Sequence, residues 1–193
     1  MKSIKKITLV ALAAVLSISF ATAQVGLQAG YSMTKSNDKN AEGMNGFHVG
    51  PTYNMTIQGP ISLQYGLLYN FVTSEIAPKT TLTNHSFDIP VRVAATFPLT
   101  SGLSVFGFAG PNFNIGLADN FKVAIGDNSA TTNLYEQDKD RSRFNLQLGL
   151  GAGLQYNNMG VKFGYDFGLL DMHKSDAINY KNNGLKAGLF FNF

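Results

Sequence analysis

Residues 143–156 read RFNLQLGLGAGLQY, and this stretch decides the fold. Apolar side chains occupy every second position, at Phe144, Leu146, Leu148, Leu150, Ala152, Leu154 and Tyr156. The positions between them carry only amide side chains and glycine. Because successive side chains of a strand point to opposite faces, this alternation predicts one long strand with an apolar face and a polar face.

Similar alternation recurs along most of the chain. It covers residues 25–34, 45–57, 61–73, 86–97, 103–116, 161–169 and 184–193. The segment 103–116 is the least regular, because Phe106 and Phe108 fall on its otherwise polar face. Transmembrane barrel strands need about 9–11 residues, whereas strands of soluble domains average about 5–6. The pattern therefore predicts an all-β protein, an eight-stranded antiparallel transmembrane β-barrel with up-and-down topology.

The connections between these segments alternate in length. Residues 58–60, 98–102 and 157–160 are short and rich in turn-forming residues. Residues 35–44, 74–85, 117–142 and 170–183 are long and polar. Short periplasmic turns at one rim and long extracellular loops at the other are typical of outer-membrane barrels.

Charged residues within the segments all fall on the polar face. They are Asp88, Arg92, Arg143, Lys162, Asp166 and Lys186, and His48 lies on the same face. A lysine or arginine on the lipid face at the membrane midplane costs about 2–4 kcal/mol. This distribution predicts that the apolar face is turned outward to lipid and that these polar residues line the lumen. Three prolines inside the segments, Pro51, Pro90 and Pro111, predict bulges or local breaks in the strand pairing.

Aromatic residues gather near the ends of the predicted strands. Two groups are expected at the membrane interfaces, Phe97, Tyr156, Phe191 and Phe193 near the short turns, and Tyr69, Phe87, Phe144 and Phe167 near the loops. Aromatic residues also have a high intrinsic strand propensity, which is the alternative explanation of their placement.

Residues 1–23 have the features of a cleaved signal peptide. Lys2, Lys5 and Lys6 precede an apolar stretch, and Ala21-Thr22-Ala23 is a suitable cleavage site before Gln24. Residues 24–193 would then form the barrel domain. The leader holds three of the 15 basic residues and no acid, so the remaining chain has equal numbers of both charges. This balance gives no reason to expect nucleic acid as a partner, and the chain contains no cysteine.

Two consecutive segments carry a family resemblance. Residues 85–98 read HSFDIPVRVAATFP and residues 102–117 read GLSVFGFAGPNFNIGL. They resemble the outer-membrane β-barrel, or "porin family", proteins of Bacteroidetes, with an Ile-Pro strand followed by an Ala-Gly-Pro segment. The resemblance implies location in the outer membrane of a Gram-negative bacterium, contact with outer-membrane lipid and lipopolysaccharide, and insertion by the barrel assembly machinery. The C-terminal Phe193 is similar to the signal which that machinery reads.

Three functions remain open. An eight-stranded barrel is just wide enough for side chains to fill it, which favours a plugged structural or surface-interaction protein over a narrow passive pore for small solutes or ions. The loop 117–142 is the candidate contact for an unknown surface partner, since Phe121, Val123 and Ile125 alternate and predict a hairpin above the membrane. A lipid-modifying enzyme is the third function considered. His85 and Ser86 are adjacent and so point to opposite faces, and we expect no catalytic residues, no metal site and no cofactor.

Overall fold

The computed structural model describes residues 23–37, 42–125, 128–137, 141–172 and 181–193. In chain order the elements are β1 (Ala23–Ser36), β2 (Met44–Gln58), β3 (Ile61–Gly66), β4 (Leu68–Ala77), β5 (Thr80–Thr100), β6 (Leu103–Ile125), β7 (Asn128–Asn133), α2 (Leu134–Gln137), β8 (Phe144–Tyr156), β9 (Met159–Gly168) and β10 (Asn182–Asn192). In the described part of the chain, no helix has the length and apolar character needed to cross a membrane.

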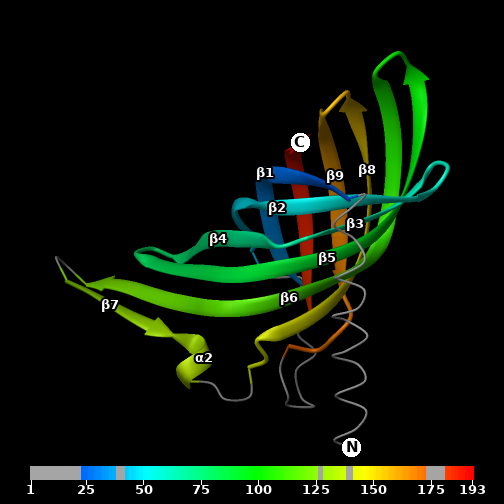
Figure 1. Cartoon of the computed structure of the whole chain (residues 1–193). Helices are drawn as coiled ribbons and strands as arrows, with labels where there is room; N and C mark the ends of the chain where they lie inside the picture. The colour runs from blue at the N-terminus through cyan, green and yellow to red at the C-terminus, as the bar shows by residue number, and fades with distance from the viewer. Residues whose placement is uncertain (1–22, 38–41, 126–127, 138–140, 173–180) are drawn as a thin grey trace, which may run out of the picture.

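Eight antiparallel strands form a closed ring. β3 and β4 are two halves of one strand, separated at Leu67, whose backbone N–H donates to the carbonyl of Pro51. Each strand of the ring pairs with its neighbours in the sequence, and β10 pairs with β1 from Gly26↔Asn192 to Ser36↔Asn182. This last pairing closes the ring (Figure 1). The predicted eight-stranded antiparallel barrel is therefore confirmed.

The two faces of the ring differ in polarity as the alternation predicts. Large apolar side chains point outward and are exposed, among them Leu150, Phe163 and Leu189, while His48 and Asn112 are among the most buried residues. A soluble barrel shows the reverse, with an apolar interior and a polar exterior. The apolar outer surface is the side that lipid would cover in a membrane.

The prolines do not shift the strand register. Pro90 pairs with Asn112 and Val93 pairs with Ala109, so the register of β5 and β6 is the same before and after the unpaired residues between them. Phe106 and Phe108 therefore point into the barrel, where both are buried. The register of this pair of strands shifts in two other places, between His85↔Ala118 and Ser86↔Gly116 and between Pro98↔Ser104 and Thr100↔Leu103. The first shift is a bulge that leaves Leu117 as an extra residue of β6.

Two of the predicted loops are largely strand. The prediction of a loop at 74–85 is wrong, because β4 and β5 continue through it and turn at Pro78 and Lys79. β5 continues because β6 extends beside it, with Thr80 opposite Val123, and β4 continues by pairing with the other edge of β5. In the loop 117–142, the predicted hairpin is confirmed as the pairing of β6 with β7. Figure 1 shows β7 and α2 beyond the ring, at the far end of the long strands β5 and β6.

Candidate functional site in the barrel interior

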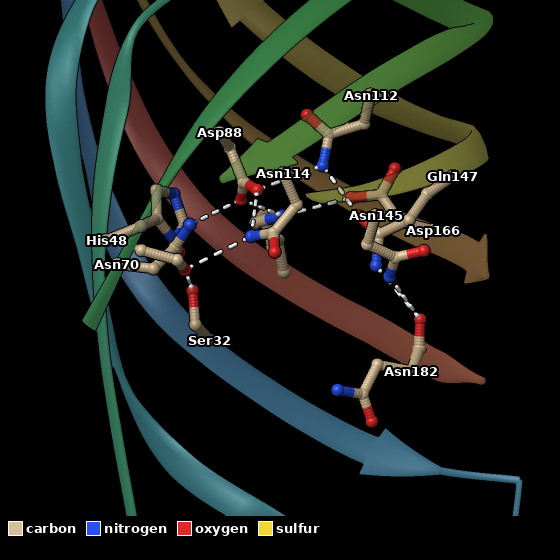
Figure 2. A network of polar contacts seen from close by, with 12 residues as sticks. Ser32, His48, Asn70, Asp88, Asn112, Asn114, Asn145, Gln147, Asp166 and Asn182 are labelled. Carbon is tan, nitrogen blue, oxygen red and sulfur yellow. Dashed lines mark hydrogen bonds and ion pairs between the residues drawn. The ribbon is translucent and has the colours of Figure 1, made fainter. Parts of the chain in front are cut away.

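A polar network crosses the barrel interior and contains at least one side chain from every strand of the ring (Figure 2). Its members are Gln28 and Ser32 of β1, His48 of β2, Asn70 of β4, Ser86, Asp88 and Arg92 of β5, Asn112 and Asn114 of β6, Asn145 and Gln147 of β8, Asp166 of β9 and Lys186 of β10. We call this set the interior network. It joins strands that are distant in the sequence across the width of the barrel.

Four charges form the centre of the interior network. The Lys186 ammonium lies 2.6 Å from an Asp88 oxygen and 3.0 Å from an Asp166 oxygen. Arg92 forms an ion pair with the other oxygen of Asp166 and also donates to the carbonyl of Gly110. Two cations and two carboxylates thus neutralise one another, as buried charges require. The absence of a side chain at Gly149 leaves room for this group, since a Cβ there would lie 1.9 Å from Asp166 Oδ1.

A chain of hydrogen bonds leads from β1 to Asp88. Asn70 donates through Nδ2 to Asp88, so its Oδ1 faces Ser32 and accepts from that hydroxyl at 3.0 Å. The Ser32 hydroxyl, having used its proton, accepts from Nδ1 of His48 at 3.0 Å. Nε2 of His48 then accepts from the Gln28 amide at 2.8 Å. With the Asn70 and Gln28 amides oriented in this way, His48 donates to Ser32 and does not act as a base toward it, although the two atoms lie within hydrogen-bond distance.

Amide side chains complete the interior network on the opposite wall. Asn112 and Asn114 donate to Asp88 Oδ1 at 3.1 and 2.8 Å. Asn112 also donates to Gln147 at 2.7 Å, and Gln147 donates in turn to the backbone carbonyl of Asn182 at 3.0 Å. These bonds connect β5, β6, β8 and β10, so the network cross-links the strands on the inner side of the barrel.

The interior network lies between two cavities. The loop-side cavity has a volume of about 220 Å³ and is lined by Ser32, Asn70 and Asp119 among others. The turn-side cavity has a volume of about 70 Å³ and is lined by Phe106, Phe108 and Lys162 among others. Lys186 lines both. Side chains of the interior network therefore form the adjoining walls of the two cavities.

A second polar cluster lies above the bulge at Leu117. The bulge reverses the facing of β6, so Asp119 points inward and is buried, where it forms an ion pair with Arg141. Burial raises the pKa of the Asp119 carboxyl, and the Arg141 guanidinium opposes this rise. Burial and the nearby Asp119 also raise the pKa of Tyr135. Sequence reasoning placed Asp119 in a loop, because nothing in the local pattern marks the bulge.

The predicted lumen residues divide into three groups. His48, Asp88, Arg92 and Asp166 are buried inside the barrel, and Lys162 and Lys186 are half-buried and line its cavities. Arg143 does not belong with them: it is exposed, donates to the carbonyl of Leu117 at 3.0 Å, and lies 4.7 Å from the Tyr135 ring centre. It precedes β8, so the alternation of that strand does not govern its direction.

The predicted interface aromatics all lie on the outer face. Phe97, Tyr156, Phe191, Phe193, Phe144 and Phe167 are exposed. Tyr69 and Phe87 are half-buried and pack edge to face, with ring centres 6.0 Å apart. Their role at the membrane interface stays a prediction.

The side chains of the adjacent residues His85 and Ser86 point to opposite faces of β5, as predicted. His85 contacts Tyr69 and the Phe71 ring on the outer face, with 2.6 Å between its Nδ1 and the Tyr69 hydroxyl, while Ser86 is buried inside. Within the described ranges, no three His, Asp or Glu side chains are grouped so that they could hold a metal ion.

Comparisons with known proteins agree with this architecture. The family model described as an outer membrane protein beta-barrel domain matches residues 16–174. The outer membrane enzyme PagL is similar in structure with a TM-score of 0.55 and 14% identity, over 87% of this chain and 98% of that one. Neisserial surface protein A has a TM-score of 0.51 and 16% sequence identity, over 89% of this chain and 99% of that one. The attachment invasion locus protein Ail of Yersinia pestis has a TM-score of 0.47 and 16% identity, also over 89% of this chain and 99% of that one. At these identities the likenesses to PagL and to Neisserial surface protein A show the fold alone. No curated protein sequence matches the chain.

Proposed function

The chain belongs to the family of outer membrane protein beta-barrel domains, and we propose that its barrel is a plugged structural and surface-interaction protein rather than a pore or an enzyme. The observation that carries this proposal is the interior network, which has a member in every strand of the ring and lies between the two cavities. A Gram-negative outer membrane of the Bacteroidetes type, and cleavage before Gln24, are part of the same proposal.

Opening a path through the interior network has a high energetic cost. The path would have to separate Lys186 from Asp88 or Arg92 from Asp166, and each of these groups is largely removed from water. Breaking a buried ion pair by removing one partner costs about 3–5 kcal/mol, because the other charge is left uncompensated. A closed interior is therefore the stable state of the barrel.

We expect the refolded protein to show no steady conductance in planar lipid bilayers. The measurement is made after heat-modifiable migration on a gel has confirmed that the barrel is folded. Reproducible single-channel current steps from the wild-type protein would contradict the plug and would favour the alternative of a narrow passive pore.

A paired variant makes this conductance measurement more informative. Arg92→Ser together with Asp166→Ser removes one cation and one carboxylate, so the net charge is unchanged while one of the two ion pairs across the centre of the interior network is lost and the Lys186–Asp88 pair remains. We expect this variant to show current where the wild type shows none. Its folding is checked by the same heat-modifiable migration.

The surface-interaction part of the proposal concerns the β6–β7 hairpin. β7 pairs with β6 along one edge and stands at the end of the strand order, so no strand among the described residues lies along its other edge. Its sequence, NSATTN, contains no charge and no proline. Natural edge strands are usually protected by lysine or proline against pairing with another chain. An edge without these residues is suited to adding a strand from a partner protein.

Shortening this hairpin is expected to abolish surface binding without unfolding the barrel. Replacing residues 122–131 by Asn-Gly keeps Phe121 opposite Thr132 and supplies a two-residue turn. The measurement is adhesion of cells that display the wild-type or the shortened protein to host cells and to purified matrix proteins, at equal surface levels. Unchanged adhesion of the shortened protein on every surface that the wild type binds would contradict a role for this edge.

A further inference from the structure

Lys35 is the last outward-facing residue of β1, at the end of the strand next to the long loops, and it is exposed. It is the only charged residue on the outward faces of the described strands β1, β2, β9 and β10. The short turns at the opposite rim, residues 58–60, 98–102 and 157–160, contain no charged residue. Positive charge on this part of the outer surface is therefore confined to the loop-side rim.

Lys181 lies beside Lys35 on the same outward face. Lys35 is directly opposite Asn183 where β1 pairs with β10. The pairing continues beyond the end of β10, because the Asn37 N–H donates to the Lys181 carbonyl at 2.9 Å and the Lys181 N–H donates to Asn37 Oδ1 at 3.0 Å. Lys181 is thus the diagonal neighbour of Lys35, and diagonal neighbours on one face of an antiparallel pair lie about 7–8 Å apart.

The protein provides no counter-charge for these two lysines. Within the described ranges, neither lysine forms an ion pair. Asp171, which follows β9 on the neighbouring strand, forms no ion pair with Lys35 or Lys181. Two ammonium groups at this separation repel each other, and a single anion between them would be attracted by both.

An apolar strip runs from the two lysines toward the short turns. Met33 of β1 pairs with Leu185 of β10, and Leu185 pairs with Tyr165 of β9. The Tyr165 ring packs against the Phe167 ring, with ring centres 4.6 Å apart. Leu185 and Phe167 are exposed on the outer surface. The lysine pair therefore lies where the apolar outer surface ends, which in a membrane is the level of the lipid headgroups.

We propose that Lys35 and Lys181 bind a phosphate group of a lipid in the leaflet next to the long loops, which is the outer leaflet. Lysine binds phosphate as a point charge, and its aliphatic stem can lie along apolar surface while the ammonium group stays at the headgroup level. The acyl chains of the same lipid lie along the apolar strip. The site depends neither on the plugged interior nor on the β7 edge.

The test compares diphosphoryl lipid A with the same lipid from which the phosphates have been removed. Binding is measured with the protein refolded in a nonionic detergent, which itself carries no phosphate. We expect saturable binding of the diphosphoryl lipid, at least about tenfold tighter than that of the dephosphorylated lipid, from two lysines at an anionic headgroup. Equal affinities would overturn the proposal. Displacement of the lipid by inorganic phosphate at the same concentration would overturn the assignment to a membrane lipid.

Paired lysine variants locate the site. Lys35→Gln with Lys181→Gln is expected to weaken binding of the diphosphoryl lipid about 25-fold, since each lysine contributes about fivefold near an anionic lipid surface. Lys79→Gln with Lys122→Gln removes the same charge from two exposed positions beyond the ring, and is expected to leave binding within about twofold of wild type. Equal losses in the two double variants would show that net charge alone attracts the lipid, and would overturn the site.

Arginine at both positions provides a further control. Lys35→Arg with Lys181→Arg keeps both positive charges, so it is expected to keep the preference for the phosphorylated lipid. Loss of this preference would contradict an electrostatic role for the pair. Heat-modifiable migration on a gel shows whether each variant is folded before its binding is measured.

Discussion

Replacing Lys186 with methionine is expected to destabilise the barrel by about 3–5 kcal/mol. The Lys186 ammonium bridges Asp88 and Asp166, and its side chain is only 17% exposed. Methionine keeps much of the side-chain volume but removes the charge, so Asp88 is left buried with amide donors alone. The measurement is equilibrium unfolding by urea of the protein in lipid vesicles, with the folded fraction read from heat-modifiable migration on a gel. A loss below about 1 kcal/mol would contradict a central role for this ion pair.

Two further variants distinguish the effect of losing the ion pair on stability from the effect of losing any lysine. Lys122→Met removes an exposed lysine from β6 and is expected to change stability by less than about 0.5 kcal/mol. Asp88→Asn combined with Lys186→Met removes both partners of the 2.6 Å contact. The double variant is expected to be more stable than Lys186→Met alone, because the uncompensated carboxylate is gone. If the losses of stability caused by Asp88→Asn alone and by Lys186→Met alone sum to the loss in the double variant, the two charges do not interact.

Adding one methyl group at Gly30 is expected to prevent closure of the ring or to weaken it by about 1–3 kcal/mol or more. Gly30 pairs with Gly188 where β1 meets β10. A Cβ at Gly30 would lie 2.2 Å from the carbonyl oxygen of Ala187 and 2.3 Å from the Cα of Gly188. These are backbone atoms of the strand that closes the barrel, so they cannot turn aside as a flexible side chain can. The Gly30→Ala protein should show little or none of the folded band on a gel.

Gly107→Ala is the matched control for this substitution. Gly107 lies in β6 on the exposed face, and a Cβ there would meet its nearest atom, the carbonyl oxygen of Gly151, at 3.8 Å. That is ordinary contact, so this protein should fold as well as the wild type. If both alanine variants fold equally well, close backbone approach does not limit closure at the β1–β10 seam.

The fold and most of the interior set were predictable from the sequence because they depend on local geometry. The side chains of a strand alternate between two faces whatever its partners are. The spacing of Leu148 and Leu150 against Gln147 and Gly149 is therefore enough to assign an outer face and an inner face. The same rule placed Asp88, Arg92 and Asp166 on the inner face, where the structure has them.

Other features depend on contacts between distant segments, and the tertiary structure alone decides them. The extension of β5 beyond the ring depends on β6 lying beside it, and the extension of β4 depends on its pairing with β5. The inward direction of Asp119 depends on the bulge at Leu117. The alternation could not identify which cation pairs with which carboxylate, because it gives the face of a residue and not its partner. Only the closed ring brings Lys186 of β10 between Asp88 of β5 and Asp166 of β9.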